Sequence, residues 1–335
     1  MQPNHAFQTE RSGQLLALDF RITVLHSSLA IARYKSLRSS FRSRESPNAV
    51  SVGLKVLRIG YYRTSCRPPE EDTMCISKSI GLNAQNQNDD VTLIQALLNL
   101  NLSLLPGVPF LTEDGVLGPH SQAVIQQFQN LVATPGVASG VIDPGSVTVT
   151  ALRAAVDGQF GSNLLHILMP LSSQEQADTF AAPLTAAMDA NQINTPLRQA
   201  HFLAQLGHES GSLRFTAELA SGAAYEGRTD LGNTQPGDGP RFKGRGLIQI
   251  TGRTNYTSYG NDRGQDYITG LNPNLLATDP NIAADCSGWF WATRHLNELA
   301  DNDDLLTITK RINGGTNGLD DRARRLKLAK CLLIP

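Results

Sequence analysis

Apolar residues recur three and four positions apart in several segments that follow Asp89, and this spacing places them on one face of an α-helix. The first such stripe consists of Val91, Ile94, Leu97 and Leu98. Helices that carry one apolar stripe bury it against their neighbours. We therefore predict a mainly α fold built from short helices.

The first 73 residues lack this pattern. They hold eleven Lys and Arg against six Asp and Glu, and the polar run Arg67–Asp72 ends them. One interpretation is a basic arm for an anionic surface; we favour a disordered or wrongly translated leader, with synthesis starting at Met74. The apolar stretch Leu15–Ala32 is interrupted by charged residues, so we expect neither a signal peptide nor membrane insertion.

Length and composition limit what the rest of the chain can be. A length of 335 residues favours two domains, and a net charge of −1 gives no reason to expect nucleic acid as a partner. The cysteines lack paired short spacings, which predicts neither a disulfide framework nor a zinc cluster and fits synthesis in a reducing compartment. The four are Cys66, Cys75, Cys286 and Cys331.

Residues 77–158 are expected to form a small three-helix domain. Asp89 or Asp90 can cap its first helix, and Pro119 suits the first turn of its second. A third short helix is expected over 147–156. Three short helices provide only a thin core.

This domain resembles the peptidoglycan-binding type 1 fold. The signature of that fold is a D-G-x-x-G-P loop followed by a helix with Ala-Val and Phe-Gln, and the chain has these in Asp114–Pro119 and Ala123–Gln129. The resemblance implies a non-catalytic module that holds the protein on the bacterial wall. The alternative is a generic three-helix domain.

Residues 162–335 contain a helix that ends near an acidic side chain. Thr195-Pro196 supplies a cap and a first-turn proline for a helix that runs to about Ser210. Glu209 follows apolar residues on this helix, and apolar surroundings favour the protonated form that a general acid needs. The alternative is an ordinary surface glutamate.

A second acid, Glu218, follows nine residues later. On one unbroken helix nine residues span about 13.5 Å, and the two carboxyls would point to opposite sides. Gly211 ends the helix and lets the chain fold back, so the two carboxyls can face each other across a cleft. Glu226 is a second candidate for the partner carboxylate, ranked below Glu218.

Two histidines on the same helix invite a metal interpretation. His201 and His208 lie seven residues apart, but Ser212 stands where a zincin motif would have its second histidine. With no third ligand in view, we interpret both as structural and predict no metal site.

A Gly- and Pro-rich stretch over 232–246 is expected to be a loop. The alternation in Leu247–Thr251 predicts a strand with Gln249 and Thr251 on one side. With Asn255, these side chains can line a polar cleft that binds sugar hydroxyls and amides. Thr251 can also position an attacking water.

Three ordered motifs resemble those of family 19 glycoside hydrolases, the chitinase and phage-lysozyme group. They are His208-Glu209-Ser210, the segment Gly244–Thr251, and Ile312-Asn313-Gly314-Gly315. The resemblance covers about 170 residues and implies a lysozyme-like, two-lobed α-helical catalytic domain. It implies no cofactor. Trp289 and Trp291, in a helix expected over 283–298, are assigned to the core.

The resemblance also implies roles for individual residues. Glu209 is expected to be the general acid, Glu218 the general base, and Thr251 the residue that orients the water. The expected substrate-binding residues are Gln249, Asn255, Asn313, Arg322 and Tyr225.

The resemblance leaves two substrates open, peptidoglycan and chitin. The attached wall-binding module and the absence of an expected signal peptide favour a monomeric endolysin, made in the cytoplasm and acting on the wall after release. It would cleave β-1,4 bonds with inversion. The alternatives are a chitinase and, from another class, a non-catalytic wall-binding protein, against which Glu209 and Glu218 argue.

Overall fold

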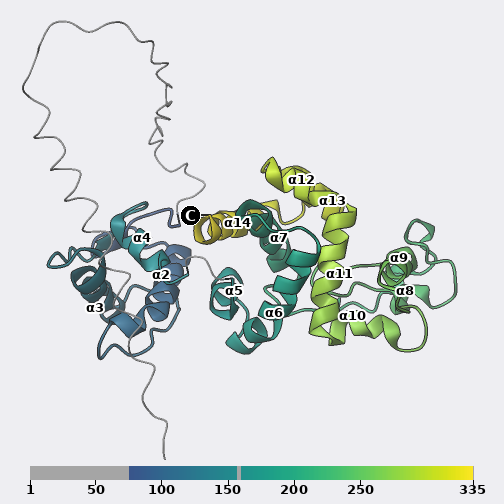
Figure 1. Cartoon of the computed structure of the whole chain (residues 1–335), viewed down its shortest axis with the longest axis horizontal. Coiled ribbons are helices and arrows are strands. Elements are labelled where there is room, and N and C mark those ends of the chain that lie inside the picture. The colour runs from purple at the N-terminus through teal and green to yellow at the C-terminus, as the bar shows by residue number, and fades with distance from the viewer. Residues whose placement is uncertain (1–74, 157–159, 335) are drawn as a thin grey trace, which may run out of the picture. The chain divides into compact units, whose positions relative to one another are not determined.

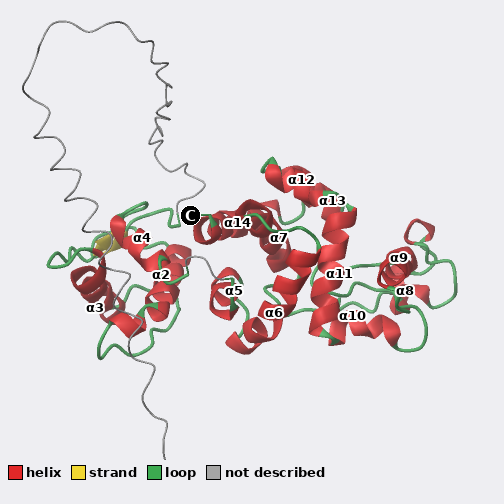
Figure 2. Cartoon of the chain, viewed as in Figure 1, coloured by secondary structure: helices red, strands yellow, loops and turns green. Residues whose placement is uncertain are grey.

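The computed structural model describes residues 75–156 and 160–334. The leader expected over residues 1–73 lies outside them. The described chain is mainly helical, as Figure 2 shows, and the predicted fold class is confirmed. In the described ranges, no helix is both long enough and apolar enough to cross a membrane.

Residues 75–156, where the first domain was expected, contain three α-helices and a minimal sheet (Figure 1). Strand β1 pairs antiparallel with β2, with Ile80 opposite Ile142. A 3₁₀ turn follows α2, and a π-helical turn follows α3. The elements are β1 (Ile80–Gly81), α2 (Asn88–Leu100), α3 (Pro119–Phe128), β2 (Val141–Ile142) and α4 (Val147–Arg153).

The start of α2 differs slightly from the prediction. Gln87 is the N-cap, and Asp89 and Asp90 lie in the first turn. The Asp90 carboxylate accepts hydrogen bonds from the backbone N–H groups of Ser77 and Lys78. It therefore anchors the start of the domain rather than capping its own helix.

The Asp114–Pro119 loop has a structural explanation. Gln95, buried on α2, donates to the Asp114 carboxylate and accepts from the Gly115 N–H. A Cβ on Gly115, at φ +71°, would lie 2.9 Å from the Asn88 carbonyl oxygen, so only glycine fits. Pro119 occupies the first turn of α3, as predicted.

Residues 160–334, where the second domain was expected, contain the remaining helices of the described chain. Helix α6 packs against α11 and helix α7 against α14, and α8 and α9 lie beyond α11 in Figure 1. The helices are α5 (Ser162–Leu168), α6 (Gln174–Ala190), α7 (Pro196–Glu209), α8 (Asp238–Arg241), α9 (Arg253–Arg263), α10 (Leu275–Thr278), α11 (Pro280–Thr293), α12 (Leu296–Asp301), α13 (Leu305–Asn313) and α14 (Leu319–Leu333).

Two local predictions in this domain are wrong. The segment Leu247–Thr251 is a turn, because Gln249 adopts φ +57° between two glycines of positive φ. The helix expected over 283–298 ends at Thr293, where the left-handed His295 separates α11 from α12. Trp289 and Trp291 are nevertheless buried in the core, as predicted.

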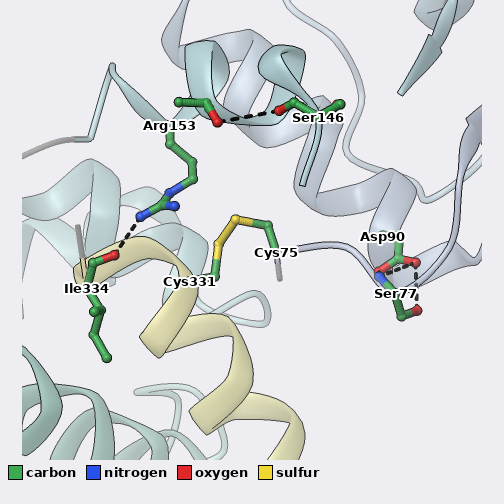
Figure 3. The surroundings of a disulfide bond; sticks show 8 residues. Cys75, Ser77, Asp90, Ser146, Arg153, Cys331 and Ile334 are labelled. Atoms are coloured by element: carbon green, nitrogen blue, oxygen red, sulfur yellow. Dashed lines mark hydrogen bonds between the residues drawn. A yellow bond between two sulfur atoms is a disulfide. The ribbon is translucent and has the colours of Figure 1, made fainter. Parts of the chain in front are cut away.

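The cysteine prediction also needs correction, because Cys75 and Cys331 form a disulfide (Figure 3). The two residues are 256 positions apart, so no short spacing could reveal the pair. Near this bond, Arg153 donates a hydrogen bond to the carbonyl oxygen of Ile334 at 2.7 Å. The start of the first domain is thus covalently joined to α14.

Candidate active site

Glu209 is the last residue of α7. The Thr195 hydroxyl accepts from the Arg198 N–H, and Pro196 follows the cap, so this helix begins as predicted. Its buried face includes Phe202 and Leu206. These contacts fix the helix end and the position of the Glu209 side chain.

The Glu209 carboxylate contacts a buried arginine. Arg322 on α14 is 1% exposed, and its Nη2 donates to Glu209 Oε1 at 2.5 Å. Its Nη1 donates to Gln205 Oε1, and its Nε donates to the carbonyl oxygen of Asn317. The sequence predicted apolar surroundings for Glu209. This prediction is wrong in part, because a buried arginine contacts the carboxylate.

Three consecutive left-handed residues turn the chain after α7. Gly211, Ser212 and Leu213 have φ values of +58°, +64° and +65°. Such values are costly for residues other than glycine and persist only when surrounding contacts enforce them. Here the Ser210 hydroxyl accepts from the Leu213 N–H at 2.8 Å, and the Leu213 side chain is buried.

The turn places Glu218 beside a different segment of the chain. The Glu218 N–H donates to the Gly244 carbonyl at 2.9 Å, and the Gly246 N–H donates to the Thr216 carbonyl at 2.9 Å. Glu218 therefore lies off the α7 axis. Gly211 ends the helix as predicted, and the two carboxyls belong to separate structural elements.

The Glu218 carboxylate has its own hydrogen-bond partners. The Tyr225 hydroxyl donates to Oε1 at 3.1 Å, and the Gly244 N–H donates to Oε2 at 3.3 Å. Burial, together with the adjacent Glu218 charge, raises the pKa of Tyr225. Tyr225 therefore remains a hydroxyl donor at neutral pH.

Glu226, the rival second carboxylate, is occupied elsewhere. Its two oxygens accept from the N–H groups of Gly237 and Gly239 at 2.7 and 2.8 Å. Both donors belong to the loop that forms α8. These contacts give Glu226 a role in the loop and support Glu218 as the second carboxylate.

Gln249 and Thr251 lie against Gly244. A Cβ on Gly244 would lie 2.8 Å from Gln249 Oε1 and 3.4 Å from Thr251 Oγ1. The Thr251 hydroxyl donates to the Gln249 carbonyl, and Asn255 Nδ2 donates to the Thr251 carbonyl at 2.7 Å. The structure thus brings Gln249, Thr251 and Asn255 together near Glu218, although through a turn and not a strand.

Asn313 belongs to the Glu209 side of the site. Its Nδ2 donates to the Asn317 carbonyl at 2.9 Å, and the same carbonyl accepts from Arg322 Nε. Asn313 Oδ1 accepts from the Gly315 N–H at 2.8 Å. The late Asn-Gly-Gly motif is thereby tied to the arginine that holds Glu209.

The sequence analysis did not identify Arg294, which connects Asn255 with helix α13. Arg294 Nη2 donates to Asn255 Oδ1 at 3.2 Å, and Arg311 Nη1 donates to the Arg294 carbonyl at 2.9 Å. Arg311 precedes Asn313 on α13. No sequence signal marks Arg294, whereas Gln205 could have been noticed because it lies one helical turn before Glu209.

The two histidines of α7 each contact a carboxylate. His201 Nε2 lies 2.7 Å from Asp303 Oδ1, and His208 Nδ1 lies 2.8 Å from Asp321 Oδ2. Burial lowers the pKa of His201, although Asp303 acts in the opposite sense. Within the described ranges no group of three potential ligands could hold a metal ion.

Part of the chain is similar to a protein-family model and to several known proteins. Residues 176–307 match the sequence model of the family described as "Chitinase class I". An endochitinase from Arabidopsis thaliana, At2g43610, is 36% identical over 35% of this chain and 39% of its own length. Chitinase C from Streptomyces griseus HUT6037 is 22% identical, with a TM-score of 0.44 over 52% of this chain and 95% of that chain.

A bacterial relative matches over most of its length. The "Glycosyl hydrolase family 19 domain-containing protein" of Haemophilus influenzae is 33% identical over 169 residues, which cover 41% of this chain and 80% of the relative. The range matched by the family model, 176–307, includes both Glu209 and Glu218. The chain therefore belongs to glycoside hydrolase family 19.

Proposed function

We propose that this glycoside hydrolase is an endolysin-type enzyme that cleaves the β-1,4 bonds of the peptidoglycan glycan strand with inversion. The observation that carries the proposal is the placement of Glu209 and Glu218 on separate elements, joined by a left-handed turn. Inverting glycosidases need two carboxyls separated widely enough to admit a water.

In this mechanism Glu209 is the general acid. It donates its proton to the glycosidic oxygen as the bond to the anomeric carbon breaks. Arg322, which contacts Glu209, holds the side chain in place and stabilises the carboxylate left after proton transfer. Gln205 and Asn317 orient the arginine in turn.

Glu218 is the general base. It removes a proton from a water that attacks the anomeric carbon from the opposite face, which inverts its configuration. Tyr225 and the Gly244 N–H fix the carboxylate, and the Thr251 hydroxyl beside Gly244 can orient the water. The amides of Gln249, Asn255 and Asn313 supply donors and acceptors for sugar hydroxyls and acetamido groups.

The choice of peptidoglycan rests on the first domain. Its Asp114–Pro119 loop and its buried Gln129 build the fold: the Gln129 amide accepts from Gly140 and donates to Val141. The resemblance of this signature to wall-binding modules supports a domain that holds the enzyme on peptidoglycan. A chitinase is the second candidate, favoured by the names of the family model and of the plant relatives.

The place of action is part of the same proposal. The Cys75–Cys331 disulfide supports action outside a reducing cytoplasm, because such bonds persist in oxidising compartments. We infer a monomeric enzyme that reaches the wall after release from the cytoplasm.

Turbidity loss of purified peptidoglycan tests the function. The wild-type enzyme, Glu209→Gln and the control Glu175→Gln, an exposed glutamate on α6, would be compared, with mass spectrometry of the fragments. We expect new reducing ends from wild type and control and none from Glu209→Gln. Cleavage of chitin oligomers alone would favour the chitinase, and wall binding without cleavage of either substrate would favour a non-catalytic protein.

A further inference from the structure

Arg294 has an unusual environment for a half-buried arginine. Its guanidinium lies 3.4 Å from the Phe290 ring centroid. Its two side-chain hydrogen bonds are long and go to neutral acceptors, Asn255 Oδ1 at 3.2 Å and Thr293 Oγ1 at 3.5 Å. Within 75–156 and 160–334, no carboxylate forms an ion pair with it.

Other partly buried arginines of the same domain are better satisfied. Arg263 binds both oxygens of Asp285, and Arg253 binds both oxygens of Asp238. Arg245 donates to two carbonyls, a tyrosine hydroxyl and an asparagine side chain. Arg294 thus keeps most of its five donors free for another acceptor.

The electrostatic surroundings of Arg294 also leave its positive charge without a partner. Burial without a compensating acid lowers the pKa of Arg294 to about 10, so the group is still a cation at neutral pH. Arg311, whose side chain donates to the Arg294 carbonyl, is exposed and has no ion pair among the described residues. One uncompensated positive charge, on Arg294, therefore contacts the amide of Asn255, and a second, on Arg311, is bonded to the Arg294 backbone.

Both arginines are linked to residues that are assigned to substrate binding. Asn255 bonds Thr251, which lies with Gln249 against Gly244 beside Glu218, and Arg311 is on the helix that ends at Asn313. A sugar that binds Asn255 would bring its substituents close to the Arg294 guanidinium. A planar guanidinium suits a carboxylate, which it can bind through two parallel hydrogen bonds.

We propose that Arg294 binds a carboxylate of the substrate beside Asn255, so that the cleft prefers an acidic glycan to a neutral one. This inference rests on the proposed function and deepens it. Chitin oligomers carry no carboxylate. Peptidoglycan offers two sources, the lactyl carboxylate of muramic residues without a peptide and the carboxylates of the peptide stem.

Three substrates separate these sources: chitin oligomers, peptidoglycan strands stripped of peptide by an amidase, and intact peptidoglycan, whose lactyl groups are in amide linkage. kcat/KM would be measured for the wild-type enzyme, Arg294→Gln and Arg294→Lys. The control Arg324→Gln removes the same charge from an exposed position on α14. Thermal unfolding would verify that each variant is folded.

We expect Arg294→Gln to lose roughly 10–100-fold in kcat/KM on at least one carboxylate-bearing substrate, with less than about threefold change on chitin oligomers. Arg294→Lys should recover part of this loss, and Arg324→Gln should lose nothing. A loss confined to stripped strands would identify the lactyl carboxylate, and a loss confined to intact peptidoglycan would identify the stem.

Two results would overturn the inference while the proposed function stands. An equal loss of kcat/KM on all three substrates would indicate that Arg294 only positions Asn255. No loss of kcat/KM on any of the three substrates would show that Arg294 does not contact the substrate. If the wild-type enzyme cleaves chitin oligomers but neither acidic substrate, the proposed function fails, and the inference fails with it.

Discussion

Arg322 donates a hydrogen bond to Glu209 although 113 residues separate them in the chain. The contact exists because α14 packs against α7, and Gln205 on α7 holds the other edge of the same guanidinium. The helix pair therefore does more than form a core. It fixes the carboxyl that we assign as the general acid.

Substitution of Arg322 should affect catalysis more than substrate binding. We expect Arg322→Lys to lower kcat by about 10²–10³-fold, since one ammonium cannot replace a guanidinium that bonds three groups. KM should change little. Steady-state kinetics on soluble oligomers would check this, with Arg324→Lys as the surface control. If a folded Arg322→Lys enzyme keeps its kcat, Arg322 has no role in the catalytic step.

Substitutions of the two candidates for the second carboxylate should have different effects on activity and stability. Glu218→Gln should lower kcat by about 10²–10⁴-fold, because the water would lose its base. Glu226→Gln should mainly lower thermal stability, since Glu226 holds the Gly237 and Gly239 N–H groups.

NMR of freshly formed product would complement this pair, because an inverting enzyme releases the α-anomer first from a β-linked substrate. The assignment of Glu218 would be contradicted if Glu226→Gln were the inactive enzyme and Glu218→Gln retained activity. A β-anomer as first product would contradict inversion itself.

Gly244 gives a steric test of the site. Gly244→Ala places a Cβ 2.8 Å from Gln249 Oε1, so the Gln249 side chain must shift, whereas Thr251 Oγ1 stays at an ordinary contact distance of 3.4 Å. We expect kcat to fall by about tenfold or more while the melting temperature changes little. Gly161→Ala is a suitable control, since no atom lies within 4 Å of its added Cβ. A fully active Gly244→Ala enzyme would show that catalysis does not depend on the position of the Gln249 side chain.

Local signals were enough to predict the elements that present the carboxyls. Thr195-Pro196 defines the start of α7, and Gly211 defines its end, because capping and helix termination depend on neighbouring residues alone. The spacing of Glu209 and Glu218 across that glycine was visible for the same reason. The mainly helical class followed from the apolar periodicity.

Contacts between distant residues could not be predicted in this way. The Cys75–Cys331 bond and the Arg322–Gln205 contact depend on how helices pack, for which the sequence offers no periodic signal. The five-residue alternation at Leu247–Thr251 was too short to distinguish a strand from a turn. The positive φ at Gln249 depends on tertiary contacts. The polar side chains reach Gly244 because the segment turns there, and not because residues alternate along a strand.

His201 should make stability depend on pH. Burial lowers its pKa below the ordinary 6.5, so the unfolded chain binds a proton that the folded chain does not. Stability from this group is therefore present above about pH 6.5 and is lost as pH falls further. Thermal unfolding at pH 8 and pH 5.5 should show a larger fall for the wild-type enzyme than for His201→Gln. Equal falls would exclude His201 as the titrating group.

The disulfide predicts a response to reduction. Mass spectrometry after alkylation of the unfolded protein should find two more reactive cysteines when it is reduced than when it is oxidised, with Cys75 and Cys331 as the added sites. Closing a loop of this length stabilises the folded state by about 5.5 kcal/mol in the chain-entropy treatment, which is an upper value. Reduction should therefore lower the melting temperature of the wild-type enzyme. Cys331→Ser should melt lower from the start and respond no further to reductant, because its only described disulfide is gone. If the wild-type protein purified under oxidising conditions gives the same alkylation pattern and melting temperature with and without reductant, Cys75 and Cys331 are not bonded, and the support that the bond gives to action outside the cytoplasm disappears.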